Sequence, residues 1–229
     1  MKATFKSFGV AACAGLIFAG GLQGEEPAAP PKPQNVLTAE QSLKRLKEGN
    51  ERYVSGDMKD RDFKPERAAL VRGQNPFASV LSCADSRVAP EYAFDTGRGD
   101  LFVVRVAGNF VSKEGLASLE YGVLALHSPL IVVLGHDSCG AVNSTINAVT
   151  KNARFPGHIS EIIDAIKPAV RAAEGDAGDL LENSTRENVL RNVERLKDST
   201  PILREAIAEG RLKVVGAIYH LDSGRVEFL

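Results

Sequence analysis

Tryptophan is absent from the 229 residues, and the chain has only two methionines and three cysteines. Aromatic contacts must therefore come from Phe and Tyr. The sequence also lacks an excess of either charge, because 28 Lys and Arg stand against 29 Asp and Glu, for a formal net charge of −1. This balance gives no indication of a nucleic-acid partner or of an acidic disordered tail. With 44% hydrophobic and 25% charged residues, the composition is that of one ordinary globular domain.

The sequence has no internal repeat, and no low-complexity tract follows residue 36. Its first 24 residues have the order of a secretory signal. Lys2 and Lys6 precede an apolar run over residues 8–22, and small residues follow at 19–24. The run is short for a membrane span, so we expect a cleaved signal peptide and an exported, periplasmic protein that is free of the membrane after cleavage.

A retained anchor and lipidation of Cys13 are the alternatives to cleavage of this segment. Residues 25–36 are rich in proline and are interpreted as a spacer. We therefore predict three parts: a signal at 1–24, a spacer at 25–36 and a single domain at 37–229.

In the domain, apolar strands alternate with helical patterns. A capping box opens at Thr38, and Pro168 predicts a kink or a break in one helix. Continuous Val, Ile and Leu strands between helices indicate a parallel sheet that is covered on both faces. We predict an α/β fold: a mostly parallel four-stranded sheet with an added edge strand, helices on both faces and an N-terminal helical arm. The expected strands are 78–82, 101–106, 130–134, 213–219 and the edge strand 225–229; the expected helices are 38–55, 114–127, 141–149, 159–173, 183–196 and one after 201.

Two chemically rich segments follow two of these strands. CADSR occupies 83–87, and HDSCG occupies 136–140. In open α/β sheets, function gathers beyond the carboxyl ends of the strands. Two thiolates and one imidazole, from Cys83, Cys139 and His136, are a suitable soft ligand set for zinc, and three protein ligands leave a fourth position open. Gly140 lets the backbone pass close to such a metal.

Two other interpretations of these residues compete with a metal site. Export would invite Cys83 and Cys139 to form a disulfide, although both stand among polar, ionisable residues. Alternatively, one cysteine is a nucleophile with His136 as its base, which leaves the other cysteine unexplained. The metal site accounts for all three residues.

The two segments together resemble the signature of beta-class carbonic anhydrases. GDLFVVRVAGN at 99–109 and EYGVL at 120–124 are also similar to that family, and the likeness extends from Leu37 to Leu229. The resemblance implies a zinc enzyme that converts carbon dioxide reversibly to bicarbonate and a proton by attack of zinc-bound hydroxide. It implies that Cys83, His136 and Cys139 are the zinc ligands. It assigns catalytic roles to Asp85 and Arg87, with Arg87 holding Asp85 away from the metal.

The same resemblance implies a substrate pocket and an oligomer. Gln74, Phe102, Tyr121 and Gly140 match substrate-binding positions, with Tyr121 reaching in from a partner subunit. The implied assembly is a homodimer or a higher homo-oligomer, in which the helix at 38–55 embraces the neighbour. Ala107 departs from the larger aliphatic residue that is common in plant-type members.

The missing tryptophan bears on the branch of this family. The allosteric branch has a tryptophan three residues before the first cysteine ligand, and this chain has Val80 there. The sequence resembles the open, plant-type branch instead. For the same scaffold, carbon disulfide hydrolysis and non-catalytic binding of zinc or bicarbonate remain alternative functions. His127 is expected to cap a helix, His158 to lie on the surface and His220 to be structural.

Overall fold

The computed structural model describes residues 37–229 except 63, 65–66 and 68–69. The predicted signal and spacer, 1–24 and 25–36, lie outside the described residues. Among the residues that are described, no helix is long and apolar enough to cross a membrane.

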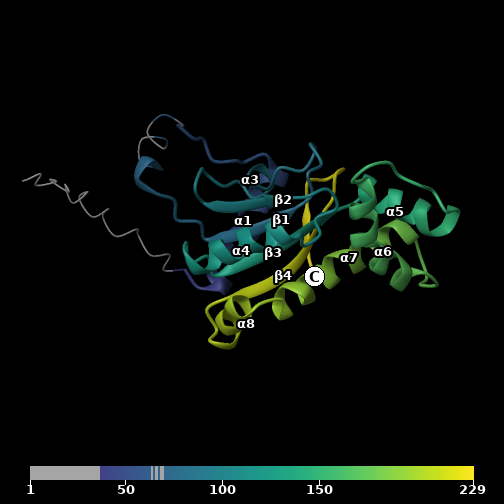
Figure 1. Ribbon diagram of the computed structural model, residues 1–229. Coiled ribbons are helices and arrows are strands. Elements are labelled where there is room, and N and C mark those ends of the chain that lie inside the picture. Colours follow the sequence, from purple (N-terminus) through teal and green to yellow (C-terminus); the bar gives the residue numbers. More distant parts are fainter. Residues whose placement is uncertain (1–36, 63, 65–66, 68–69) are drawn as a thin grey trace, which may run out of the picture. The chain divides into compact units, whose positions relative to one another are not determined.

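A five-stranded sheet forms the centre of the domain, with the strand order β2-β1-β3-β4-β5 (Figure 1). The first four strands pair in parallel, and β5 runs antiparallel to β4. This confirms the predicted parallel sheet with an added edge strand. The strands are β1 (Ala78–Ser82), β2 (Leu101–Arg105), β3 (Leu130–His136), β4 (Lys213–Tyr219) and β5 (Val226–Phe228).

The two central strands are buried along their whole length, which explains their unbroken apolar sequence. Every residue of β1 and of β3 is buried. A strand that is covered on both faces has no solvent side for polar residues to occupy. Strand β3 extends two residues beyond the predicted 130–134, and its last residue is the buried His136.

Helices cover both faces of the sheet, as predicted. On one face, α1 (Ala39–Ser55) and α3 (Pro90–Ala93) pack around Leu46 and Phe94. On the other face, α4 (Lys113–Leu124), α7 (Leu180–Asp198) and α8 (Pro201–Ala208) pack around Leu119 and Leu196. The remaining helices, α5 (Gly140–Lys151) and α6 (Ile159–Ala173), lie beyond one end of the strands (Figure 1).

The N-terminal helix α1 is anchored to its own sheet. Its capping box is present, because the Thr38 side chain and the Gln41 side chain each accept from the other residue's backbone N–H. Gly49 faces the turn after α3 so closely that a Cβ there would lie 1.9 Å from the carbonyl oxygen of Phe94. Only glycine permits this approach of α1 to α3.

Three local predictions differ from the structure. The sequence predicted a kink or a break at Pro168. Helix α6 is continuous through this residue, so it does not break there; the buried face that includes Ile163 and Ile166 keeps the helix packed despite the missing N–H. Helix α4 ends at Leu124, and His127 lies beyond it with a left-handed φ of 55°. Helix α3 and the 3₁₀ turn η1 (Leu70–Arg72) were not predicted from the sequence.

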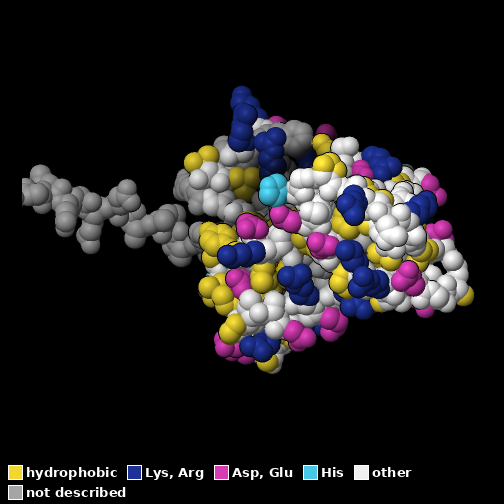
Figure 2. Space-filling view, turned by 45° about the vertical axis from the view of Figure 1, so that its right-hand side comes forward, with side chains coloured by type: hydrophobic (Ala, Val, Ile, Leu, Met, Phe, Trp, Pro, Cys, Tyr) yellow, Lys and Arg dark blue, Asp and Glu magenta, His cyan; other side chains and the backbone are white. Residues whose placement is uncertain are grey.

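The face seen in Figure 2 carries acidic and basic side chains that are interspersed over most of its area. Neighbouring charges often pair, as in the contacts of Lys167 with Asp164 and of Lys197 with Glu194. Exposed pairs of this kind contribute little to stability.

Candidate metal centre

Three potential metal ligands meet at the carboxyl ends of the two central strands. Cys83 directly follows β1, His136 ends β3, and Cys139 is the N-cap residue of α5. Because β1 and β3 are parallel neighbours, their ends lie side by side. The ligand atoms of the three residues all lie within 4.8 Å of one another, and all three residues are buried.

The donor set fits zinc. Both cysteines are free thiols, so they do not form the alternative disulfide. His136 Nδ1 lies 2.8 Å from the carbonyl oxygen of Asp137, which makes this nitrogen the N–H donor. His136 Nε2 is buried and has no hydrogen-bond partner among the described residues. A buried lone pair beside two thiols, with the other ring nitrogen fixed by a carbonyl, is typical of a zinc-binding histidine.

The protein stabilises a thiolate at Cys83 before any metal binds. A hydrogen bond from the Cys139 thiol, together with the backbone N–H groups of Gly108 and Asp85, outweighs burial and lowers the pKa of Cys83 to about 4. Those two N–H groups lie 3.3 Å and 3.4 Å from Cys83 Sγ. Donation to that thiolate and burial raise the pKa of Cys139, although N–H groups at the start of α5 oppose the shift.

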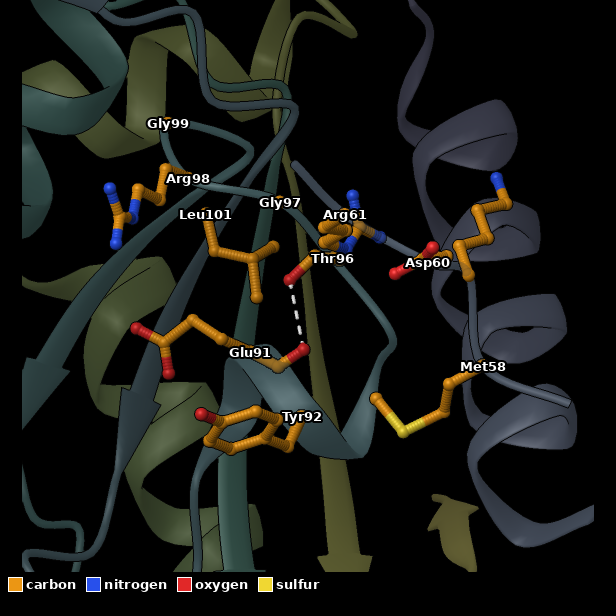
Figure 3. Close-up of a pocket in the computed structure, with 11 residues that line it drawn as sticks. Met58, Asp60, Arg61, Glu91, Tyr92, Thr96, Gly97, Arg98, Gly99 and Leu101 are labelled. Atoms are coloured by element: carbon orange, nitrogen blue, oxygen red, sulfur yellow. Dashed lines mark hydrogen bonds between the residues drawn. The ribbon is translucent and has the colours of Figure 1, made fainter. Parts of the chain in front are cut away.

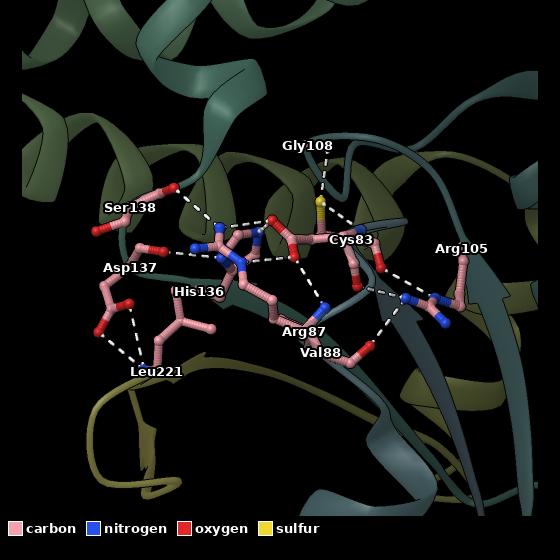
Figure 4. Close-up of polar contacts among 10 residues, drawn as sticks. Cys83, Arg87, Val88, Arg105, Gly108, His136, Asp137, Ser138 and Leu221 are labelled. Carbon is pink, nitrogen blue, oxygen red and sulfur yellow. Dashed lines mark hydrogen bonds and ion pairs between the residues drawn. The ribbon is translucent and has the colours of Figure 1, made fainter.

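Asp85 forms an ion pair with Arg87, whose side chain lies beside His136 in Figure 4. Arg87 Nε donates to Asp85 Oδ1 at 2.9 Å, and Nη2 donates to Oδ2 at 2.8 Å. These bonds are the main reason that the pKa of Asp85 falls well below its usual range. Asp85 Oδ2 remains 3.8 Å from His136 Nε2, so an ionised carboxylate stands at the edge of the ligand cluster.

Arg105 holds the turn that carries Cys83 and Asp85, a role that the sequence analysis missed. Its guanidinium donates to three backbone carbonyls of that turn: Cys83 at 3.1 Å, Asp85 at 2.6 Å and Val88 at 2.8 Å. The available signal was a charged residue at the end of an otherwise apolar strand.

Three of the predicted substrate-binding residues do not join this cluster within one chain. Phe102 pairs in register with Ser79, four residues before Cys83, which places it roughly 13 Å down the strand at ~3.3 Å per residue. Tyr121 stacks near Phe102, with the ring centroids 6.2 Å apart. Gln74 is exposed and lies beside Gly99, two residues before β2 begins.

Gly140 does lie next to the cluster, directly after Cys139. A Cβ at this position would have no atom within 4 Å in this chain. Within the chain, therefore, glycine is not required by close packing, and the space above residue 140 is open.

A separate cavity of about 750 Å³ lies between the segment after α1 and the turn that leads into β2 (Figure 3). Met58, Arg61, Tyr92 and Arg98 are among its lining residues. None of the three metal ligands and none of the predicted substrate-binding residues lines it.

The fold and the site together define a class: an α/β protein with a Cys-His-Cys ligand set at the strand ends, the three-ligand arrangement that is typical of catalytic zinc. Over residues 78–226 the sequence matches the family described as carbonic anhydrase. Carbonic anhydrase 2 of Mycobacterium tuberculosis is 42% identical over 183 residues, which is 80% of this chain and 88% of the relative. The carbonic anhydrase of Mycolicibacterium smegmatis is 39% identical, covering 80% of this chain and 90% of the relative.

Solved structures agree with this match. The beta-carbonic anhydrase CcaA has a TM-score of 0.64 and 27% identity, covering 82% of this chain and 98% of that chain. The Coccomyxa beta-carbonic anhydrase in complex with acetazolamide has a TM-score of 0.65 and 27% identity, covering 82% and 84%. This chain belongs to the carbonic anhydrase family, with the beta-class fold.

Proposed function

We propose that the chain catalyses the zinc-dependent, reversible hydration of carbon dioxide, with Asp85 and Arg87 as its catalytic pair. The observation that supports this most strongly is the direction of Asp85, whose two oxygens bind Arg87 while the cluster offers three protein ligands, Cys83, His136 and Cys139. A structural metal site would have four protein ligands. Hydration rates of carbon dioxide with the zinc-loaded protein test the proposal, and a fully loaded protein without activity would refute it.

Bound zinc supplies a Lewis acid that makes a water molecule nucleophilic near neutral pH. Cys83, His136 and Cys139 would hold it, and Asp85 Oδ2, at the edge of the cluster, would accept a hydrogen bond from the attacking water. That contact orients the water's lone pair toward the carbon of the substrate. Arg87 keeps Asp85 ionised and prevents it from turning onto the ligand cluster. Carbon disulfide hydrolysis and non-catalytic binding are not favoured, since the homologues that cover most of the chain are carbonic anhydrases.

We propose further that two copies of the chain complete each substrate pocket. Phe102, Tyr121 and Gln74 gather at the free edge of β2, remote from their own metal centre. On α4 beside this edge, Tyr121 is 48% exposed and Leu124 is 64% exposed. A two-fold contact through this face would present these residues to the partner's site. The structural neighbours from Sordaria macrospora are described as tetrameric, with a TM-score of 0.62.

A complementation experiment tests the shared pocket. One variant, Cys83→Ser, lacks a metal ligand but keeps Tyr121; the other, Tyr121→Ala, keeps the metal ligands. If the pocket is shared, mixed dimers contain one intact site, so activity reappears when the two variants exchange subunits. Two inactive variants that stay inactive after proven exchange would contradict the shared pocket.

For the segment outside the described residues, we propose cleavage of the signal at 1–24 and delivery to the periplasm. The support is the sequence order of basic residues, apolar run and small residues. Mass spectrometry of the N-terminus in the periplasmic fraction tests it, and an intact N-terminus in the cytoplasmic fraction would contradict it.

A further inference from the structure

The structure points to a positioning residue for the metal centre that is distant from it in sequence: we propose that Asn188 of α7 fixes the loop 106–111, so that the N–H of Gly108 donates to the Cys83 thiolate. This inference rests on the proposed zinc site. Asn188 itself touches neither a ligand nor substrate.

Gly108 is held at both ends of its backbone. Its N–H donates to Cys83 Sγ at 3.3 Å, and its carbonyl oxygen accepts from Asn188 Nδ2 at 2.9 Å. Asn188 is only 2% exposed, so this bond has no competition from bulk water. The carbonyl of Gly108 would otherwise be a buried acceptor that needs a partner.

A second asparagine, one turn further along α7, fixes the direction of the first. Asn192 Nδ2 donates to the backbone oxygen of Asn188 at 2.7 Å and to its Oδ1 at 3.1 Å. Asn192 Oδ1 accepts from the N–H of Val111 at 2.8 Å. With its oxygen engaged by Asn192, Asn188 is left with its NH₂ group to donate to Gly108. The two amides therefore clamp the loop at two positions, residues 108 and 111.

The loop is also enclosed sterically at the same place. Gly108 has a left-handed φ of 79°, and a Cβ there would lie 2.4 Å from Ile166 Cδ1 and 3.1 Å from Ala141 Cβ. The loop thus has close neighbours on α5 and α6, and Asn188 holds it from α7. Packing excludes a side chain at residue 108, but the hydrogen bond from Asn188 determines the direction of the Gly108 N–H.

A hydrogen bond to a coordinating thiolate draws electron density from the sulfur and tunes the metal that it binds. Since two thiolates already offset the charge of a divalent zinc ion, the N–H of Gly108 would help to keep the metal acidic. Loss of the clamp would free the loop and weaken this bond. We expect a change at the metal centre rather than only a loss of stability.

The test compares Asn188→Ala with Ser184→Ala. Ser184 lies one turn earlier on α7, is 0% exposed, and its hydroxyl has no hydrogen-bond partner among the described residues, so it is a matched polar truncation. Competition with a chelator measures zinc affinity, and the thiolate-to-metal charge-transfer band of cobalt-substituted protein reports on the sulfur ligands. Asn188→Ala should bind zinc roughly 10–100-fold more weakly and shift the band. Ser184→Ala should change neither.

An Asn188→Ala protein with wild-type zinc affinity and an unshifted band would overturn the inference. Changes of equal size in Ser184→Ala would overturn it as well. If Asn188→Ala does not fold, Asn188→Asp keeps the shape and the acceptor while it removes the donor, and the same two measurements apply.

Wild-type protein loaded with isotopically labelled cadmium gives an independent measurement. A scalar coupling between the metal and the Gly108 amide proton is expected across the N–H···S bond, and its absence would refute the contact. Failure of the wild-type protein to bind zinc at all would refute the proposed function instead, so the two failures are distinguishable.

Discussion

The guanidinium of Arg87 binds the carboxylate of Asp85 through two parallel hydrogen bonds, at 2.9 Å from Nε and 2.8 Å from Nη2. A third bond, from the backbone N–H of Arg87 at 3.0 Å, reaches Asp85 Oδ1. Together these contacts point the carboxylate away from the Cys-His-Cys cluster, although Oδ2 is only 3.8 Å from His136 Nε2. We therefore expect the pair to determine whether Asp85 serves as a hydrogen-bond acceptor or as a fourth metal ligand.

Arg87→Ala should keep its zinc and lose activity by roughly a hundredfold or more, the loss typical of one preorganised group in an active site. Freed from Arg87, Asp85 can turn onto the metal and occupy the position that water needs. Arg87→Lys cannot form two parallel hydrogen bonds to the carboxylate, so its activity should lie between that of the wild type and that of Arg87→Ala. Metal analysis and carbon dioxide hydration rates measure both effects, and near-normal turnover in Arg87→Ala would contradict this role.

Removing a metal ligand should have a different signature. Cys83→Ser and His136→Ala should each lose zinc and nearly all activity, because two remaining ligands hold the metal poorly. Ser86→Ala is the control, since Ser86 is exposed on the same loop and should leave both properties unchanged. If His136→Ala retained full zinc and full activity, the assignment of the metal centre would be wrong.

Bicarbonate should act as a simple product inhibitor. Val80, at the position of the tryptophan in the allosteric branch, is completely buried in the core of the sheet. Arg105 nearby is already engaged by three backbone carbonyls. A ligand shifts an equilibrium only through its different affinity for the two states. Val80 has no indole N–H with which to build a bicarbonate pocket that favours a closed form. Initial-rate kinetics should therefore be hyperbolic in bicarbonate; cooperative inactivation would contradict this expectation.

The buried carboxylate of Asp95 should make stability depend on acid pH. Burial raises the pKa of Asp95, but hydrogen bonds from Arg52, from the Lys59 N–H and from Arg61 outweigh burial and lower it. Because the folded protein then binds this proton less tightly than the unfolded chain, the stabilisation is complete above the unfolded-state pKa. It is lost as the pH falls through the folded-state pKa.

Asp95→Asn should therefore lose about 1–3 kcal/mol of unfolding free energy at neutral pH. The difference from the wild type should shrink as the solution is acidified. Asparagine tolerates the left-handed φ of 42° at this position, so the backbone is not strained by the change. Urea unfolding at several pH values measures the difference in unfolding free energy, with Asp176→Asn, at an exposed position, as the control. A difference that stays constant down to acid pH would rule out the ion pair as its cause.

Much of the fold could be predicted because its signals are local. The apolar runs at 78–82 and 213–219 became strands with those bounds, and the helix at 159–173 was also correct. The helix does not break at Pro168, because proline marks a missing N–H but not the packing that compensates for it. The four-residue helix α3 is too short to show a periodic pattern.

The site could be predicted where its residues are close in sequence to a strand end. Asn188 and Asn192 could not be found in this way, because they lie on a helix more than a hundred residues after Cys83 and look like ordinary polar positions. Only the packing of α7 against the loop 106–111 reveals them. For the same reason, the distance of Phe102 from its own metal centre became apparent only from the strand register.

The metal content of the wild-type protein, purified without added zinc, tests the central claim most directly. Quantitative elemental analysis, combined with peptide mapping under conditions that preserve disulfides, reports on the metal and on the two cysteines in one sample. We predict about one zinc per chain, bound by three protein ligands, and no peptide that joins Cys83 to Cys139. A protein without zinc in which these two cysteines form a disulfide would contradict the account.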